Sequence, residues 1–322
     1  MELVERCAGA LVGLACGDAV GTTVEFRPRG TFEPLRDMVG GGPFGLAPGQ
    51  WTDDTSMALC LADSLLARGG FDAADQMARY VNWWRWGYRS ATGVCFDIGN
   101  TVCAALGRFE STGDPFAGSE RPDTAGNGAL MRLAPVVLFF HPDRDAVQRH
   151  AVSSSRTTHA APEALDCARL LAHVLSRALD GASKPDLLDA RDLALESSAV
   201  HDLAQGGYLA KPASAIRGTG YAVASLEAAL WCVAHTDTFE AAVLEAANLG
   251  DDADTTAAIV GQVAGAHYGL AAIPRHWHAR LHLAAEIESI ARRLAAASFL
   301  RARRADLPRP RSGAMNIQEM PR

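Results

Sequence analysis

The sequence predicts an all-α protein, a compact helical bundle with orthogonal or mixed packing, and three observations lead to this fold class. Alanine and leucine dominate a hydrophobic fraction of 48%, and clusters of β-branched residues are sparse. Apolar residues recur at spacings of three and four along most of the chain, which is the period of an amphipathic helix. Alternation with a period of two is hardly seen, so no parallel sheet is expected.

Successive helices are expected wherever this period is bounded by capping residues or by glycine. The first run ends before Gly17, and the second is closed by Gly69 and Gly70, because glycine readily adopts the left-handed conformation that ends a helix. The predicted helices span residues 3–16, 53–68, 73–86, 97–109, 127–140, 162–179, 187–199, 221–235, 239–248, 252–268 and 278–300.

Two long connections interrupt this series. Residues 27–50 and 111–126 contain too many glycines and prolines to form regular elements. A loop of such length inside a compact domain is usually a lid or a binding loop. No domain boundary or internal repeat is visible, so residues 1–300 are interpreted as one domain. Residues 301–322 are polar and contain prolines, which predicts a disordered tail.

Composition narrows the functional class. The formal net charge of −7 disfavours general nucleic-acid binding, because the phosphate backbone attracts Lys and Arg. The seven cysteines are scattered and form no CxxC pair, as in reduced cytosolic proteins. Neither a signal-peptide pattern nor an apolar stretch of about 20 residues is found. We therefore expect a cytoplasmic protein without a membrane span, and we expect it to be a monomer.

Two predicted helix starts carry more acidic residues than a helix cap can use. They are residues 52–55 (TDDT) and residues 251–256 (DDADTT). Either alone is explained by an N-cap followed by acids that favour the helix dipole. If the two starts meet, at least four carboxylates converge, and divalent cations would relieve their repulsion. Oxygen ligands without a neighbouring His or Cys favour Mg²⁺ or Mn²⁺ over zinc.

Six short motifs follow one another between residues 8 and 268. They are GLACGDA at 13–19 with VEF at 24–26, GQWTDDT at 49–55, DIGNT at 97–101, GNGALMR at 126–132, TH at 158–159 and NLGDDADTT at 248–256. In this order they resemble the motifs of the ADP-ribosylhydrolase family, most closely those of its bacterial branch, the dinitrogenase reductase-activating glycohydrolases. Each motif alone is only moderately specific, whereas six in the right order are highly specific.

The resemblance implies an all-α fold with a dinuclear magnesium or manganese centre at helix N-termini. Its implied metal ligands are Thr52, Asp53, Asp54, Asp252, Asp254 and Thr255. Asp251 departs from much of the family, which has glycine at this position. It adds a negative charge beside the metals, and of the two interpretations left open, metal ligand or helix cap, the cap is favoured.

The substrate site is expected around the GNGA segment at residues 126–129. Glycines that lead into a helix expose backbone N–H groups that suit a phosphate, although a simple helix cap is an equal interpretation of the residues alone. The resemblance places the pyrophosphate and distal ribose of ADP-ribose here, with His159 at phosphate or ribose and Tyr221 against the adenine. The implied substrate-binding residues are Asn100, Gly126, Asn127, Gly128, Ala129, Met131, His159 and Tyr221.

Two carboxylates are candidates for proton transfer. Asp97 by itself is most simply an N-cap, but in the bacterial branch the equivalent Asp lies over the scissile bond. Glu25 precedes the long loop, and in related hydrolases this Glu is a mobile acid near the metals. Asp97 is the first candidate for general acid–base chemistry and Glu25 the second.

These observations predict a metal-dependent hydrolase that removes ADP-ribose from ADP-ribosylated protein and releases ADP-ribose. Arginine is the preferred linkage, because Asp97, Glu25 and Asp251 would make the mouth of the site attractive to a guanidinium. One alternative is cleavage of serine-linked ADP-ribose or O-acetyl-ADP-ribose. The other is a catalytically silent ADP-ribose-binding protein of the same fold, against which the complete set of six ligands argues.

Overall fold

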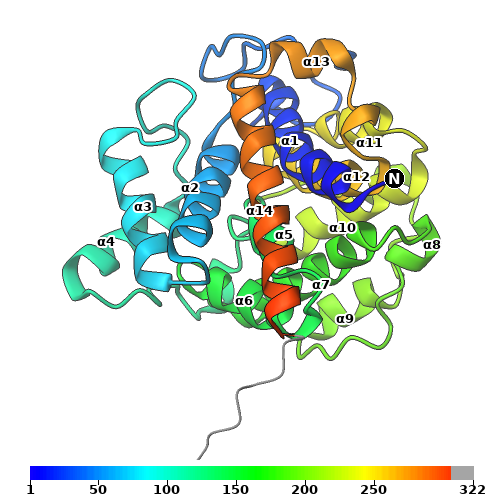
Figure 1. Cartoon of the computed structure of the whole chain (residues 1–322). Coiled ribbons are helices and arrows are strands. Elements are labelled where there is room, and N and C mark those ends of the chain that lie inside the picture. The colour runs from blue at the N-terminus through cyan, green and yellow to red at the C-terminus, as the bar shows by residue number, and fades with distance from the viewer. Residues whose placement is uncertain (306–322) are drawn as a thin grey trace, which may run out of the picture.

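The structure is a computed structural model, and it describes residues 1–305. Over that range the chain forms fourteen α-helices, four short 3₁₀ helices and, instead of a sheet, isolated β-bridges (Figure 1). The α-helices are α1 (Leu3–Gly21), α2 (Asp53–Arg68), α3 (Ala73–Trp86), α4 (Asn100–Thr112), α5 (Ala134–Phe140), α6 (Arg144–Arg156), α7 (Pro162–Leu179), α8 (Lys184–Leu187), α9 (Ser198–Ala204), α10 (Ala222–His235), α11 (Phe239–Ala247), α12 (Ala253–Tyr268), α13 (Arg275–Arg280) and α14 (Ala284–Ala305). The 3₁₀ helices are η1 (Thr22–Val24), η2 (Pro122–Thr124), η3 (Ala213–Ala215) and η4 (Leu270–Ala272). The predicted all-α fold is confirmed.

An antiparallel pair of helices, α1 and α12, forms the centre of the bundle. One face of α1 carries a glycine at every fourth position, at Gly9, Gly13, Gly17 and Gly21. A Cβ atom at these glycines would clash with the backbone of α12 at Gly265, Gly261, Ala257 and Ala253, respectively. Because neither face carries a bulky side chain at the contact, the two backbones approach closely. This contact places the last turn of α1 beside the first turn of α12.

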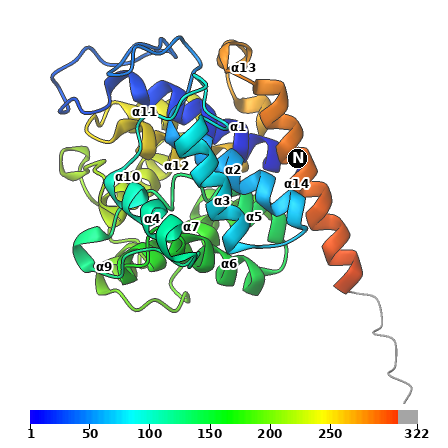
Figure 2. The same ribbon diagram turned by 90° about the vertical axis from the view of Figure 1, so that its left-hand side faces the viewer.

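The other helices surround this pair. α2, α5 and α14 pack against α1, while α10 and α11 cover α12. α3 packs on α2, and α7 packs on α6 and α10. Figures 1 and 2 both show α14 running along the outside of the bundle. The buried core is continuous across these helices.

Several predicted helices have different boundaries. The prediction for residues 97–109 is wrong at its start, because Asp97 has a left-handed φ of 58° and α4 begins at Asn100. Residues 127–133 form turns, so only the second half of the predicted 127–140 helix exists, as α5. The polar helix α6 was missed, although Asp143 caps it by accepting a hydrogen bond from the Ala146 amide.

The predicted helix over residues 187–199 is wrong for a visible reason. One carboxylate oxygen of Asp166 accepts hydrogen bonds from the amides of Glu196 and Ser197, each at 2.7 Å. These bonds hold the chain in a turn, and α9 starts only at Ser198. Similarly, α13 and α14 replace the single helix predicted for residues 278–300.

Both ends of the chain also correct the sequence analysis. α14 continues to Ala305, five residues into the predicted tail, and residues 306–322 lie outside the described part of the chain. The segment Leu3–Val24 is long and apolar enough to cross a membrane, so the expectation that no such stretch exists is wrong. However, 94% of its most apolar window is buried within the fold, as in the core helix of a globular protein.

Candidate active site

An acid from α1 holds the first turn of α2. Asp18 Oδ1 accepts hydrogen bonds from the amide and the hydroxyl of Thr52, both at 2.9 Å. Its Oδ2 accepts from the amide of Thr55 at 3.0 Å and from the hydroxyl of Thr55 at 2.6 Å. The side chain of Thr52 makes no cap bond of its own. Asp18 therefore caps α2 from a neighbouring helix and fixes the position of the acidic start.

The two acidic helix starts meet beside Asp18. The Thr52 hydroxyl oxygen lies 3.1 Å from Asp54 Oδ2 and 3.3 Å from Asp254 Oδ2, in addition to its contact with Asp18. One hydroxyl hydrogen can serve only one of these three carboxylates. Carboxylate oxygens of Asp18, Asp54 and Asp254 lie within 4.8 Å of one another, as do those of Glu25, Asp97 and Asp254. We call these residues, together with Asp53 and Asp252, the acidic cluster.

The acidic cluster fits a divalent cation. Asp54 Oδ1, Asp254 Oδ1 and Glu25 Oε2 are buried and have no hydrogen-bond partner among residues 1–305. Burial and mutual repulsion raise the pKa of Asp53, Asp54 and Asp254 well above the ordinary value. Unpaired buried oxygens are costly, and hard cations take such oxygens as ligands. The cluster can therefore hold a divalent metal ion.

Two members of the cluster have pKa values suited to proton transfer. Burial and the charges of Asp18 and Asp252 raise the pKa of Asp97 to about 7. Burial and the charges of Asp97 and Asp252 raise the pKa of Glu25 to about 9. The left-handed backbone of Asp97 is uncommon for a residue other than glycine, and such strain is concentrated at functional sites. Asp97 is not the N-cap of α4, which is Gly99.

Backbone contacts with the start of α12 hold Glu25 and the long loop in place. The Phe26 amide donates to the Asp251 carbonyl at 2.7 Å, and the Asp251 amide donates to the Arg27 carbonyl at 2.9 Å. The expectation that Asp251 caps α12 is wrong, because the N-cap is Asp252. Asp251 instead has a φ of 54°, a conformation that glycine adopts without strain. Its carboxylate adds charge to the cavity wall.

One cavity of about 1210 Å³ joins the acidic cluster to the GNGA segment. The predicted site residues that line it are Glu25, Asp53, Asp97, Asn100, Gly126, Asn127, Gly128, Met131, His159, Asp252, Asp254 and Thr255. Thr52 and Asp54 are buried and do not line the cavity. Ala129 and Tyr221 are not among its lining residues either. Ala129 is buried, and Tyr221, which is 41% exposed, donates a hydrogen bond to Glu163 at 2.6 Å.

One part of the cavity wall, which we call the glycine end, consists of Gly126, Gly128 and His159. A Cβ atom at Gly128 would lie 2.8 Å from His159 Cε1, and one at Gly126 would lie 3.2 Å from His159 Nε2. Burial and nearby Arg132 lower the pKa of His159 to about 3, so the imidazole is neutral at pH 7. The Asn127 amide group donates to Asp252 Oδ2 at 2.7 Å and thereby links the glycine end to the acidic cluster.

An aromatic rim stands at the mouth beside the acids. The ring centroids of Phe26 and Phe44 lie 6.4 Å apart, and those of Phe44 and Phe96 lie 5.1 Å apart. Phe26 and Phe44 line the cavity together with Glu25 and Asp97. Aromatic faces next to carboxylates can receive a planar cation.

Comparison with known proteins assigns the family. The profile of the ADP-ribosylglycohydrolase family matches residues 1–304. The chain belongs to this family. It is 46% identical over 293 residues to "ADP-ribosylarginine hydrolase Tri1" of Pseudomonas putida (strain GB-1), which covers 91% of this chain and 78% of that protein. It is 32% identical over 289 residues to "ADP-ribosyl-[dinitrogen reductase] glycohydrolase" of Rhodospirillum rubrum, covering 88% of this chain and 92% of that protein.

A solved structure agrees with this assignment. A chain of an "ADP-ribosylglycohydrolase-related protein complex" matches with a TM-score of 0.81 and 47% sequence identity. The match covers 92% of this chain and 99% of that one. The resemblance seen in the six motifs is therefore confirmed at the level of the ADP-ribosylglycohydrolase family.

Sequence reasoning missed two features of this ADP-ribosylglycohydrolase site. Asp18 lies in the GLACGDA motif, and an acid at the end of an apolar, glycine-bearing helix was a signal for a buried role. The aromatic rim gave no signal, because Phe26, Phe44 and Phe96 are isolated in segments rich in glycine. Only the folded loop brings these three rings together.

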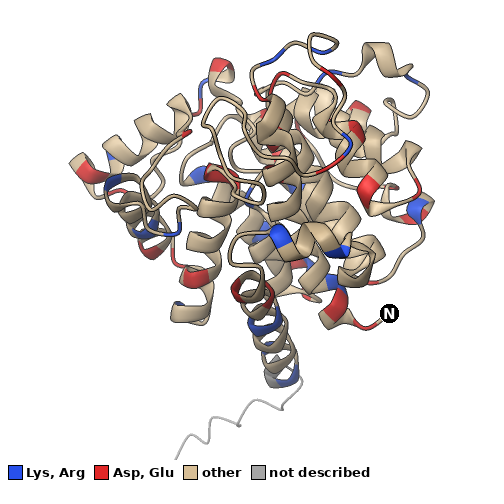
Figure 3. Ribbon diagram, turned by 90° about the horizontal axis from the view of Figure 1, so that it is seen from above, with Lys and Arg blue, Asp and Glu red and all other residues tan. Residues whose placement is uncertain are grey.

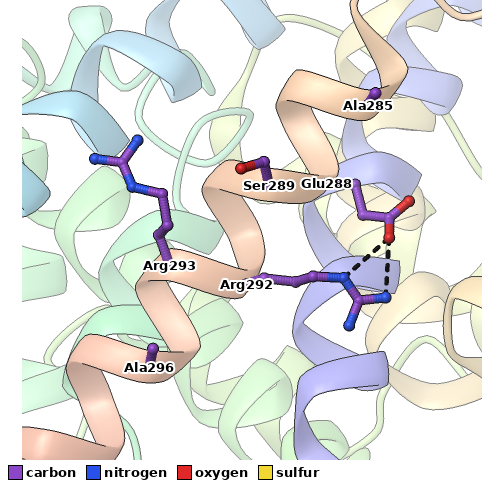
Figure 4. Close-up of a pocket in the computed structure, with 6 residues that line it drawn as sticks. All are labelled: Ala285, Glu288, Ser289, Arg292, Arg293 and Ala296. Carbon is purple, nitrogen blue, oxygen red and sulfur yellow. Dashed lines mark hydrogen bonds and ion pairs between the residues drawn. The ribbon is translucent and has the colours of Figure 1, made fainter.

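The groove along α14 is a weaker candidate for an active site than the large cavity. A shallow groove of about 420 Å³ runs along α14, where Figure 4 shows Arg292 reaching toward Glu288 while Arg293 points away on the other side. Arg292 Nη2 lies 2.9 Å from Glu288 Oε1 and 3.0 Å from Glu5 Oε1, so its charge is already paired. Basic and acidic positions are interspersed over the helices and loops in Figure 3. The large cavity is therefore the candidate active site.

Proposed function

We propose that this protein hydrolyses the N-glycosidic bond between ADP-ribose and an arginine side chain of a modified protein. The observation that carries the proposal is that one cavity is lined both by the acidic cluster and by the glycine end. The name of the Pseudomonas putida relative, an ADP-ribosylarginine hydrolase, supports the same activity. A cavity of about 1210 Å³ has room for a ligand as large as ADP-ribose.

The cavity suggests how ADP-ribose is oriented. Its pyrophosphate would lie at the glycine end, against the backbone of Gly126 and Gly128 and the ring of His159. Its distal ribose would lie at the acidic cluster. Asn100 and Met131 also line the cavity, and Ala129 is buried in the same segment as Gly128. Tyr221 is joined to Gly126 by an antiparallel bridge and would flank the adenine from outside the cavity.

We propose two Mg²⁺ or Mn²⁺ ions as cofactors. The residues that would hold them are Thr52, Asp53, Asp54, Asp252, Asp254 and Thr255. When bound, such ions orient substrate hydroxyls and lower the pKa of a water molecule. Asp18 acts beside them as the cap that positions α2, and Asn127 orients Asp252 from the cavity wall.

The residues of this chain then account for proton transfer. Asp97 is the candidate that donates a proton to the guanidine nitrogen as the bond from ribose C1 to that nitrogen breaks, because burial favours its protonated form. Carboxylates of the acidic cluster stabilise the positive charge that develops at C1. Water adds to C1, and its proton returns to Asp97. Glu25 is the second candidate for this role.

The leaving group is tested by comparing kcat/KM for ADP-ribosyl-arginine and ADP-ribosyl-serine peptides, with O-acetyl-ADP-ribose as a third substrate. We expect the arginine peptide to be preferred, because the aromatic rim and the acids at the mouth suit a guanidinium. Equal or higher values for serine would refute the arginine assignment. Binding of ADP-ribose without turnover of any substrate, with Mn²⁺ present, would instead identify a silent binding protein.

We further propose that the protein acts as a cytoplasmic monomer and that α1 serves as a core helix. The burial of α1 against α12 supports the second point, since a helix enclosed by others has no free apolar face for lipid. Light scattering during size-exclusion chromatography would measure the mass in solution, and a mass of twice 34.1 kDa would contradict the monomer. Recovery of the intact protein in the membrane fraction of lysed cells would contradict the proposed location.

A further inference from the structure

Arg132 is a buried cation whose neighbours are unusual. Its side chain is 1% exposed, and burial, offset only in part by the charge of Asp53, lowers the pKa of its guanidinium. Its guanidinium lies over the ring of Tyr80 at 4.7 Å, and Nη1 donates to the sulfur of Met57 at 3.6 Å. Its one short hydrogen bond runs from Nη2 to the hydroxyl oxygen of Thr158, at 2.6 Å. Burying a cation with so few partners is costly, so its single strong contact calls for an explanation.

That contact determines the direction of the next hydrogen bond. A guanidinium only donates, so the Thr158 oxygen must be the acceptor. Thr158 is fully buried, and the other polar atom that its hydroxyl reaches within the described chain is Nδ1 of His159, at 2.8 Å. If Nδ1 carried a proton, the Thr158 hydroxyl hydrogen would be left without an acceptor. The hydroxyl therefore donates to Nδ1.

The hydrogen bond from Thr158 determines the tautomer of His159. Burial and Arg132 keep the imidazole neutral, and a neutral imidazole with an accepting Nδ1 carries its proton on Nε2. Nε2 makes no hydrogen bond to residues 1–305, and His159 lines the cavity at the glycine end. Gly126 and Gly128 leave the space that the ring occupies, so the ring is held in position from that side.

We propose that Arg132 and Thr158 are positioning residues that fix His159 as the Nε2–H tautomer, so that a neutral imidazole donates a hydrogen bond to the pyrophosphate of ADP-ribose. The other tautomer would present a lone pair to the anion and would repel it. The identity of the acceptor as a pyrophosphate rests on the proposed function, whereas the tautomer itself does not.

The tautomer is measured directly from the imidazole ¹⁵N chemical shifts of the ¹⁵N-histidine-labelled full chain, with His159→Gln used to assign the signals. We expect the wild type to show a protonated Nε2 at pH 7 without any ligand. Thr158→Val keeps the size of the side chain but removes the hydroxyl, and we expect it to lose the single tautomer. Thr158→Ser keeps the hydroxyl and is the matched control.

The consequence is measured by calorimetric titration of the same variants with ADP-ribose. Thr158→Val should raise Kd about tenfold, as expected for the loss of one well-oriented hydrogen bond to a charged group, and Thr158→Ser should stay within about twofold. Mn²⁺ affinity should be similar in both variants, since Thr158 does not contact the acidic cluster. Tm should fall in Thr158→Val, because buried Arg132 loses its short hydrogen bond, and should change little in Thr158→Ser. A protonated Nδ1 in the wild type would overturn the proposal.

Wild-type affinity in Thr158→Val would overturn it as well. Failure of the wild type to cleave an ADP-ribosyl-arginine peptide would refute the proposed function but leave a protonated Nε2 in place.

Discussion

The two ends of the cavity bury titratable groups in opposite ways. At the acidic cluster, burial and like charges raise pKa values, and three buried carboxylate oxygens lack a partner among residues 1–305. At the glycine end, burial lowers the pKa of His159, and its ring is held by Thr158 on one side and two glycines on the other. The acidic cluster can therefore take up a cation, whereas the glycine end is already organised in the protein alone.

This difference predicts how substitutions at each end should change the rate of turnover and the free energy of unfolding. Removing a charge from the acidic cluster relieves repulsion while the cation is absent, so function and stability should change in different directions. At the glycine end the protein already supplies every contact that orients the ring. Four predictions test this contrast, beginning with the largest expected effect.

Asp254→Asn should lower turnover at least about 10²–10³-fold, the loss seen when one preorganised electrostatic group is removed from an active site. It should also weaken Mn²⁺ binding, because Asp254 belongs to both groups of converging carboxylates. The metal-free variant should melt at or above the metal-free wild type. A much lower melting temperature would show that the cluster is structural instead.

Asp97→Asn should keep metal and ADP-ribose binding but reduce kcat about 10²–10⁴-fold, the contribution of a general acid–base group. Asp251→Asn is the matched control, because Asp251 also has a positive φ and also lines the cavity. We expect the control to retain kcat within about threefold, which is small beside that contribution. Single-turnover kinetics would separate the two variants, and near-normal turnover by Asp97→Asn would leave Asp97 without a chemical role.

The metal-free protein should lose stability as pH rises from about 6.5 to about 9. At pH values above 4.5, the ordinary pKa of a glutamate, Glu25 is deprotonated in the unfolded state but stays protonated in the folded state until about pH 9. The folded state therefore binds more protons than the unfolded state, and the free energy of unfolding falls as pH rises. Asp97 acts in the same direction up to about pH 7. His159 acts in the opposite direction, because its pKa is lower in the folded state. Its contribution to stability is fully present above pH 6.5 and is lost only as pH falls toward about 3.

Thermal melts across this range should show a fall in Tm on the order of 5 °C, because one proton retained over about 2.5 pH units is worth about 3 kcal/mol and each kcal/mol shifts Tm by about 2 °C in a domain of this size. Saturating Mn²⁺ should remove the dependence by occupying the cluster. Glu25→Gln is the control, since it has no proton to release and should flatten the slope. A Tm that rises with pH in the metal-free wild type would contradict the burial of repelling acids.

Asp251→Gly should have the smallest effect. The φ of 54° suits glycine, and relief of that conformation opposes the extra freedom that glycine gives the unfolded chain, so stability should change by less than about 1 kcal/mol. Loss of the charge should lower kcat/KM slightly for a guanidinium-bearing substrate. A chemical denaturation curve gives the first quantity and steady-state kinetics the second, and a large loss of kcat would show that Asp251 takes part in the reaction.

Much of the fold and site was accessible from local patterns. The helical period gave the fold class, and helix starts rich in acid marked Asp53, Asp54, Asp252 and Asp254 as groups that converge. The predicted helices failed at residues 127–133 and 188–197, where hydrogen bonds from elsewhere in the chain hold turns, as Asp166 does for Ser197. At residues 97–99 the left-handed φ of Asp97 delays the helix start. Helical propensity is weak enough for such contacts to override it.

The sequence by itself determined the family, the all-helical class and the chemical character of the site, because these depend on residue types and their order. The tertiary structure alone decided which atoms meet. The glycine face of α1 brings Asp18 to the start of α2 and α12, and Asn127 reaches Asp252 across 125 residues of chain. The proton position on His159 likewise depends on Arg132 and Thr158 together. Such contacts join segments whose separation along the chain carries no information about their distance in space, so they appear only once the helices are packed.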